Sequence, residues 1–218
     1  MTISNFRFSV VHGTGRTHGR FGFTLIELLM VITIIGLLAS LIGWGLSRAS
    51  ITKNRKRVEG ELAGITLAID GFHKKHGFYP AGNATLLSGN VVNTGTNQLL
   101  YELTGVGANK AGGMFTNVFG ETISTAEVRS TFGVDGFVNA GTTRDEYPNF
   151  LSDLKPDEHA TIPGTSVRVL VVPVKGPGGV FNPWHYNSTS PEHNPESYDL
   201  WADIVVGGGM MRIGNWKD

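Results

Sequence analysis

An almost uncharged apolar run near the N-terminus constrains this chain more than any other feature. Residues 23–46 read FTLIELLMVITIIGLLASLIGWGL and contain a single charged residue, Glu27. As an α-helix, this run would extend about 36 Å, and the hydrocarbon core of a bilayer is about 30 Å thick. A helix of a soluble core seldom stays apolar on all sides over such a length. We therefore expect residues 23–46 to form a membrane-inserted helix.

Two other interpretations of the apolar run stay open. A secretory signal peptide has an apolar region of about 7–15 residues followed by small residues at its cleavage site. Ala39 and Ser40 resemble such a site, but apolar residues continue beyond them and an acid lies in the first turns. An unprocessed signal anchor is the second alternative. Basic residues flank the run on both sides, and their count alone would favour a cytoplasmic C-terminal side. We set this count aside because of the motif around Glu27 described below.

Glu27 is the anomaly within this run. A carboxylate at the centre of a bilayer costs about 2.5–3.5 kcal/mol on insertion scales, so it usually has a partner and a function. No Lys or Arg lies within one helical turn of Glu27. We therefore expect its partner to come from elsewhere.

The residues around this acid resemble a known signal. Residues 20–29 read RFGFTLIELL, which is similar to the signal sequence of type IV prepilins and of type II secretion pseudopilins. The resemblance implies that prepilin peptidase cleaves between Gly22 and Phe23 on the cytoplasmic face, and that the new amino terminus at Phe23 is N-methylated. Gly22 suits this role because a backbone without a side chain can lie extended in a protease cleft. Residues 1–22 would then be a cleaved leader.

The same resemblance implies a structural function and not an enzyme. It implies a single-pass protein of the bacterial inner membrane, with its head in the periplasm, that later joins a periplasmic or cell-surface filament. The implied partners are prepilin peptidase, identical or related pilin subunits, the inner-membrane assembly machinery and membrane lipid. In the filament, Glu27 of one subunit is expected to pair with the Phe23 amine of a neighbour and so to set the axial register, since breaking a buried pair typically costs about 3–5 kcal/mol.

After residue 46 the pattern changes to that of a surface helix. Apolar residues follow one another at helical spacing from Val58 to Phe72, and charged residues lie largely off this stripe. No proline occurs between residues 23 and 79, and Gly77 and Pro80 mark the end. We expect an amphipathic stem helix over residues 47–79 that continues the apolar helix and packs on a globular head.

Residues 80–218 are predicted to form this head. The pattern predicts a short helix near residues 98–104, otherwise irregular loops over 81–143, and strands at 166–174, 198–206 and, more weakly, 211–215. The expected fold class is α+β: a long N-terminal helical stem packed on a head that contains a small antiparallel sheet and long loops.

Three short segments resemble landmarks of the major pseudopilin of type II secretion: residues 76–80 (HGFYP), 182–184 (NPW) and 197–201 (SYDLW). Members of that family often bind calcium in the loop after the last of these landmarks. Here the loop retains Asp203 but has no acidic cluster, and calcium prefers about 6–8 oxygen ligands. Asp203 is therefore only a weak calcium candidate, and no other cofactor is expected.

Composition excludes several other classes. The chain has no cysteine, so it has no disulfide, no thiolate metal site and no cysteine nucleophile. Its net charge is zero, which gives no reason to expect a nucleic-acid partner. His73 and His76 lie three residues apart, but the lysines between them indicate a solvated helix end and not a metal site. The C-terminal tryptophans, Trp184, Trp201 and Trp216, are expected to serve packing.

Together these features predict a filament subunit, with a pseudopilin of type II secretion favoured because the chain lacks the disulfide common in pilus pilins. A type IV pilus pilin for adhesion, motility or DNA uptake is the alternative. A membrane-anchored binding domain is the alternative from another class.

Overall fold

A computed structural model describes residues 22–87, 91–109 and 111–217, and within them the side chains of residues 41–47, 86 and 91 are not described. The predicted leader, apart from Gly22, lies outside the described residues. The chain divides into two units, Met1–Gly45 and Leu46–Asp218.

One long helix, α1, covers Leu25–His76. This confirms the prediction that one continuous helix runs from the apolar run into the stem. The helix ends where the sequence indicated: Gly77 has a positive φ of 82°, and its N–H donates to the carbonyl of His73 at 2.8 Å. A glycine in this conformation is a common helix terminator, because it satisfies a carbonyl of the last turn without steric strain.

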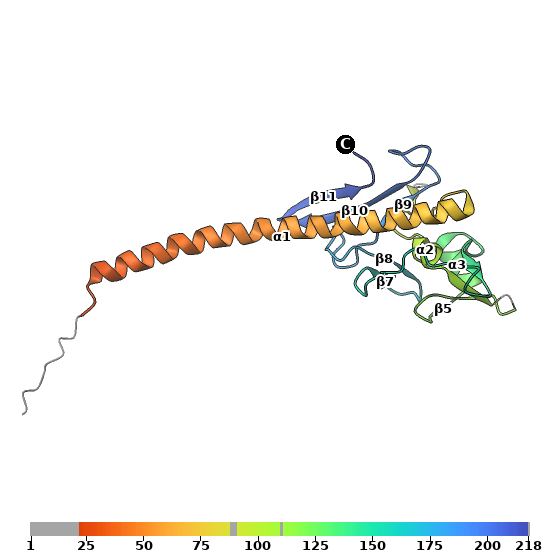
Figure 1. Ribbon diagram of the computed structural model, residues 1–218, viewed down its shortest axis with the longest axis horizontal. Coiled ribbons are helices and arrows are strands. Elements are labelled where there is room, and N and C mark those ends of the chain that lie inside the picture. The colour runs from red at the N-terminus through yellow and green to blue at the C-terminus, as the bar shows by residue number, and fades with distance from the viewer. Residues whose placement is uncertain (1–21, 88–90, 110, 218) are drawn as a thin grey trace, which may run out of the picture. The chain divides into compact units, whose positions relative to one another are not determined.

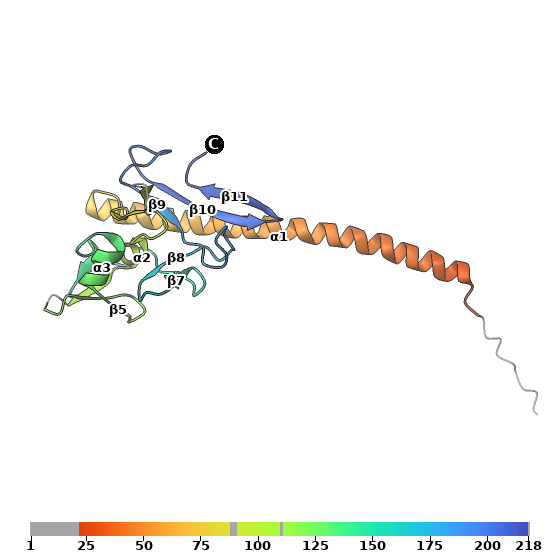
Figure 2. The ribbon, with the colours of Figure 1, turned by 180° about the vertical axis from the view of Figure 1, so that it is seen from behind.

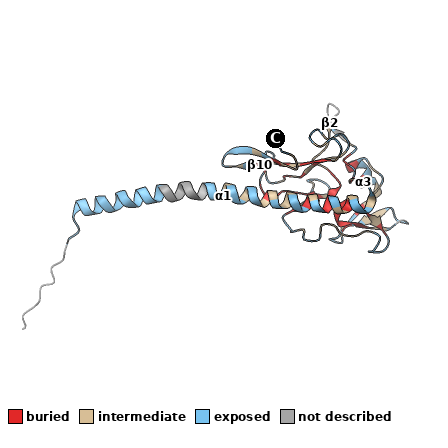
Figure 3. Ribbon diagram, turned by 45° about the horizontal axis from the view of Figure 1, so that its top comes forward, coloured by how far each residue is buried: buried red, intermediate tan, exposed pale blue. Residues whose placement is uncertain are grey.

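The part of α1 in the second unit contributes one face to the core of the head. Val58, Ile69 and Phe72 are fully buried and Ile65 is nearly so, whereas the intervening Leu67 is exposed. Figure 3 shows this alternation of buried and exposed positions along the head end of α1. The predicted stem stripe is therefore the buried stripe, as expected for a helix that is apolar on one side.

The described residues of the head form four small sheets. A hairpin pairs β1 (Leu86–Leu87) with β2 (Val91–Val92), and a second two-stranded sheet pairs β7 (His159–Thr161) with β8 (Arg168–Leu170). The four-stranded sheet has the order β5-β4-β3-β6, built from β3 (Val106–Asn109), β4 (Met114–Thr116), β5 (Thr122–Ser124) and β6 (Ala140–Gly141). The three-stranded sheet has the order β11-β10-β9, built from β9 (His185–Asn187), β10 (Asp199–Val206) and β11 (Gly209–Gly214).

These elements lie on two sides of the second half of α1. In Figures 1 and 2, the hairpin of β10 and β11 runs along one side of the helix, and β7, β8, α2 (Leu99–Thr104) and α3 (Thr125–Phe132) lie on its other side. Buried side chains from both sides join the stem in one hydrophobic cluster, which includes Leu100, Leu170 and Leu200. The head is thus assembled around a helix that also belongs to the N-terminal segment.

Several expectations for the head are confirmed. The short helix near residues 98–104 is α2, the strand at 198–206 is β10, and the weak strand at 211–215 overlaps β11. Gly207 and Gly208 form the turn between β10 and β11, and both have the positive φ that such a tight hairpin requires.

Two expectations for the head are wrong. Residues 81–143 are not irregular loops, because they contain two sheets and α3. The expected α+β class is confirmed, and β11-β10-β9 is an antiparallel sheet, but the described residues form further sheets, one of which includes the parallel pair β3–β6. The strand predicted at 166–174 is shorter, since only β8 pairs with β7. Beyond it the chain changes partner: the N–H of Val172 donates to the carbonyl of Asn182 at 2.8 Å.

Candidate assembly segment and head pocket

The predicted processing site lies just before the first helical residue. Gly22 and Phe23 precede Leu25 in non-helical backbone, and both are exposed. A side chain added at Gly22 would meet no atom within 4 Å. A protease can therefore reach this peptide bond without unfolding α1.

Thr24 and Glu27 form a capping box at the start of α1. The backbone N–H and the hydroxyl of Thr24 donate to Oε2 of Glu27 at 2.9 and 2.7 Å, and the N–H of Glu27 donates to the Thr24 hydroxyl at 3.3 Å. Such reciprocal bonds satisfy backbone donors that the first turn of a helix leaves unpaired. Glu27 therefore has hydrogen-bond partners within its own chain, whereas the expected charged partner from a neighbouring subunit stays a prediction.

The helix after this cap exposes apolar side chains in every direction. Phe23 is 74% exposed, and Figure 3 shows the described positions of this part of α1 as exposed throughout. Contiguous apolar patches of this kind mark surfaces that bind protein or lipid. The exposed large apolar residues of this segment are Phe23, Leu25, Ile26, Leu28, Leu29, Met30, Val31, Ile32, Ile34, Ile35, Leu37 and Leu38.

Over the part of the chain that the structure describes, no helix reaches the length and apolarity that crossing a membrane requires.

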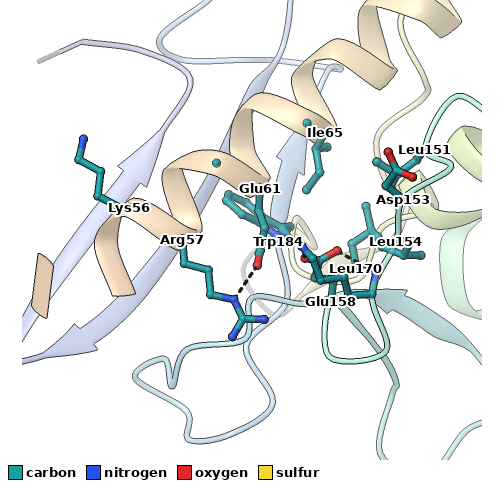
Figure 4. A pocket seen from close by; sticks show the side chains of 13 residues that line it. Lys56, Arg57, Glu61, Ile65, Leu151, Asp153, Leu154, Glu158, Leu170 and Trp184 are labelled. Atoms are coloured by element: carbon teal, nitrogen blue, oxygen red, sulfur yellow. Dashed lines mark hydrogen bonds and ion pairs between the residues drawn. The ribbon is translucent and has the colours of Figure 1, made fainter. Parts of the chain in front are cut away.

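The head contains a pocket that the sequence did not indicate. It has a volume of about 390 Å³ and lies between α1 and the segment of residues 151–158. Figure 4 shows side chains converging from both, with Glu61 on the helix and Glu158 on the facing segment. Trp184 and Leu170 contribute apolar wall to the same pocket. The pocket combines this apolar wall with three acids, Glu61, Asp153 and Glu158, and three basic residues, Lys56, Arg57 and Lys155.

Glu61 is the unusual residue of this pocket. Its side chain is 8% exposed, and its nearest cation is Arg57, whose Nε lies 3.6 Å from Oε1. Among the described residues, neither carboxylate oxygen has a hydrogen-bond partner. Burial, and next the negative charge of Glu158, raise the pKa of Glu61 to about 8. Glu61 therefore binds a proton near neutral pH.

The weak calcium candidate, Asp203, is engaged by a neighbouring strand. Nε and Nη2 of Arg212 donate to its two carboxylate oxygens at 2.8 and 2.9 Å, across the β10–β11 pair. Within the described residues, no group of three or more His, Asp or Glu side chains is arranged to hold a metal ion. The geometry therefore gives the calcium candidate no support.

The histidines of the stem and the C-terminal tryptophans make different kinds of contact. His73 stacks on Tyr79 and His76 packs against Phe72, so both rings join the end of the stem. Trp184 is buried in the core, as expected for packing. Trp201 and Trp216 are only half-buried and line a second pocket, so the expectation of packing alone is incomplete for these two.

Comparison with known proteins bears on the N-terminal segment. Residues 17–43 match the family described as prokaryotic N-terminal methylation motif. This match supports a type IV pilin-like protein that is processed by prepilin peptidase and assembles with pilin subunits. No curated protein and no solved structure matches the chain.

Proposed function

We propose that this chain is a non-enzymatic structural subunit of a type IV pilin-like filament, and specifically a pseudopilin of a type II secretion system. Before assembly, residues 23–46 lie in the bacterial inner membrane and the head lies in the periplasm. In the filament, the same residues form the core. The observation that carries the proposal is the exposed apolar surface of residues 23–38, directly after the predicted cleavage site and within the matched motif.

The physical argument concerns where this surface can be stable. Twelve large apolar side chains exposed to water would favour aggregation, and burying each contributes roughly 1.5–3 kcal/mol. The core of the head is built from residue 58 onward, and residues 23–40 are exposed. Lipid before assembly and identical or related subunits afterwards are two environments that cover such a surface on all sides.

Glu27 has a defined task in this arrangement. The capping box uses Oε2, and cleavage creates a positive amine at Phe23. In the filament, the Phe23 amine of a neighbouring subunit pairs with the Glu27 carboxylate and fixes the axial register, because a buried charge without a partner is strongly destabilising. Thr24 orients the carboxylate, but the pairing depends on the charge of Glu27 and not on these hydrogen bonds.

Three variants separate the charge of Glu27 from its capping function. Glu27→Gln keeps a carbonyl oxygen that can accept the Thr24 bonds but removes the charge, Thr24→Ala removes the cap but keeps the charge, and Glu27→Ala removes both. We expect all three chains to be processed, and expect filaments only from Thr24→Ala when assembly is followed by electron microscopy. Normal filaments from Glu27→Gln would contradict the proposed pairing.

Deletion of the chain in its host distinguishes the two kinds of filament. Loss of protein secretion without visible surface fibres supports the pseudopilin. Long surface fibres that contain this chain, with secretion intact, would replace that proposal by a pilus pilin for adhesion, motility or DNA uptake. A processed chain that forms no filament of either kind would leave a membrane-anchored binding domain.

A further inference from the structure

The pocket between α1 and residues 151–158 is a site that the filament proposal does not use. All of its lining residues lie in the head unit, so a ligand site here does not depend on that proposal. Its volume of about 390 Å³ lies within the range of roughly 300–1,000 Å³ that is typical of ligand sites. Ile65, Leu170 and Trp184 line it with buried side chains, and two leucines of the facing segment complete the apolar wall (Figure 4). Such a wall suits an aliphatic ligand.

Two glycines form part of the helix side of this pocket. Gly60 and Gly64 lie four residues apart, and therefore on one face of α1. A Cβ added at either position would meet no atom within 4 Å. Glu61 follows Gly60 directly, so a ligand can approach the stem beside this acid without meeting a side chain from either glycine.

The basic residues of the pocket are already engaged. Each of the three is hydrogen-bonded to an acid: Lys56 to Glu59 at 2.9 Å, Arg57 to Asp157 at 2.6 Å and Lys155 to Glu158 at 2.5 Å. Figure 4 also shows Lys56 pointing away from Glu61. An anionic ligand would have to displace one of these acids, so the pocket does not favour an anion.

Glu61 is an acid that lacks such a partner. Its side chain is 8% exposed, and neither of its oxygens accepts a hydrogen bond from a residue that the structure describes. Arg57 lies 3.6 Å away, beyond hydrogen-bond distance, and its Nη2 donates to Asp157. A buried polar group without a partner costs free energy, so this arrangement indicates a donor that the isolated head does not supply.

Asp153 is a second acid of the pocket without a cation beside it. It lines the pocket, is exposed, and belongs to no ion pair within the described ranges of the chain. Together, Glu61 and Asp153 favour a positively charged ligand over an anion, because the three cations of the pocket are hydrogen-bonded to other acids.

The cation that fits this pocket is an alkylammonium group. A metal ion is disfavoured, because no three His, Asp or Glu side chains of the described residues are arranged to hold one. An ammonium group carries three N–H donors, and a charged donor makes a stronger hydrogen bond with a carboxylate than a neutral one does. Its alkyl chain matches the apolar wall.

We propose that this pocket binds a primary alkylammonium group, whose chain packs on Ile65, Leu170 and Trp184 and whose N–H groups donate to the carboxylate of Glu61. Because no described residue holds that carboxylate by a hydrogen bond, it turns toward the ligand without breaking one, and Arg57 keeps its bond to Asp157. A free aliphatic amine and a lysine side chain of another protein both present this group. The head then carries a recognition site in addition to the assembly function of α1.

Ligand and proton compete for Glu61 in this arrangement. The charged groups that face Glu61 are Arg57 on α1 and Lys155, Asp157 and Glu158 on the facing segment. Burial and Glu158 raise the pKa of Glu61 to about 8, whereas an alkylammonium group keeps its own proton up to about pH 10. Binding should therefore tighten as pH rises from 6.5 to 8.5, because less of Glu61 has to lose a proton when the ligand binds.

The test uses the full chain in a non-ionic detergent, so that no detergent charge competes with the probes. Isothermal titration calorimetry measures the Kd of pentylamine, which represents a free amine, and of Nα-acetyl-lysine methylamide, which represents a lysine side chain. We expect at least one probe to bind, with a Kd more than about tenfold lower at pH 8.5 than at pH 6.5. Binding of the second probe alone would assign the ammonium group to a protein, and binding of pentylamine alone would assign it to a free amine.

Uncharged compounds of matched shape control for the apolar wall. Pentan-1-ol and Nα-acetyl-norleucine methylamide keep the alkyl chain but lack the ammonium group. Each should bind at least about tenfold more weakly than the corresponding amine, because neither supplies a charged donor to Glu61.

Two variants separate the charge of the pocket from its space. Glu61→Gln should raise Kd at pH 8.5 at least about tenfold and remove the pH dependence of binding. Gly64→Leu leaves every charge in place but puts a side chain at the open helix side, and it should also raise Kd at least about tenfold. Ala63→Leu is the matched control, because Ala63 is exposed on the same helix and does not line the pocket, so Kd should be unchanged.

Circular dichroism of each variant separates loss of binding from loss of fold. Leucine is a better helix former than glycine, so Gly64→Leu should keep α1 intact and decides the outcome even if Glu61→Gln alters the head. The proposal is overturned if neither amine binds, or if the uncharged compounds bind as tightly as the amines. It is equally overturned if Glu61→Gln or Gly64→Leu binds as the parent does.

Discussion

The two halves of helix α1 differ in how they expose their apolar side chains, although they belong to one helix. Residues 25–40 are exposed on every side and largely apolar, whereas the part in the head buries one stripe, from Val58 to Phe72, and leaves the rest to water. The second half is stabilised by its own chain. The described residues of the first half are exposed, and the filament proposal names an environment, lipid or neighbouring subunits, that would cover them.

The largest expected effect is on the free energy of unfolding, which should depend on the second half of α1 and not on the first. Phe72→Ala removes a fully buried ring from the head core and should lower the free energy of unfolding by about 3–5 kcal/mol. Ile34→Ala, in the exposed half, should leave the stability of the head unchanged. Denaturant unfolding of the full chain, followed by near-UV circular dichroism, measures both.

Leu67→Ala is the matched control within the stem. Leu67 lies on the same helix but is 73% exposed, so its truncation should change the free energy of unfolding by less than about 0.5 kcal/mol. If Ile34→Ala destabilised the head as much as Phe72→Ala does, the distinction between the halves would be lost.

The next effect contrasts the acids of the two halves. Glu27 is exposed and hydrogen-bonded by Thr24, whereas Glu61 is buried with a pKa raised to about 8. The unfolded chain ionises Glu61 near its ordinary pKa of about 4.3, so the folded head binds the proton more tightly. The free energy of unfolding should therefore fall as pH rises from about 5 to about 8.

Glu61→Gln should remove this dependence. The variant should be more stable than the parent by about 1–3 kcal/mol at pH 8 and nearly equal to it at pH 5, in denaturant unfolding at both pH values. Glu59→Gln is the control, because Glu59 is paired with Arg55 and Lys56 on the surface and is ionised throughout this range. An unchanged pH dependence in Glu61→Gln would show that Glu61 ionises normally.

The smallest effect compares two capping boxes of the same design. Ser124 and Glu127 at the start of α3 repeat the bonds that Thr24 and Glu27 make, with the Ser124 hydroxyl donating to Glu127 at 2.7 Å. Ser124→Ala should cost the head about 1 kcal/mol. Thr24→Ala should leave head stability unchanged, because its helix turn lies in the other unit. If thermal unfolding showed that Ser124→Ala and Thr24→Ala lower the stability of the head equally, the independence of the two units in stability would be contradicted.

The regular parts of this fold could be predicted because their signals are local. The helix, its end at Gly77 and strand β10 each follow from periodicity and terminator residues within a few positions. The sheets of residues 81–143 could not, because strands of two to four residues carry little pattern and depend on distant partners. The β3–β6 pair illustrates this, since Val106 pairs with Ala140, which lies 34 residues further along the chain.

The candidate sites also differ in whether a local sequence signal predicts them. Gly22, Phe23 and Glu27 belong to a local motif, and their processing and assembly roles remain predictions. The charge of Glu61 alone indicates a surface residue, although its place three residues after Val58 and four before Ile65 puts it on the buried stripe. Trp201 and Trp216 give no sequence signal for a shared pocket, because β10 and the C-terminal segment bring them together only in the folded head.

The central claim is that this chain is a prepilin, and one measurement tests it most directly. The chain is co-expressed with a prepilin peptidase, and the intact mass and N-terminal peptide of the membrane fraction are determined by mass spectrometry. The account predicts loss of residues 1–22 and a methylated Phe23, with an uncleaved chain when the peptidase is omitted. An intact N-terminus in the presence of the peptidase, or a cut near Ala39, would contradict it.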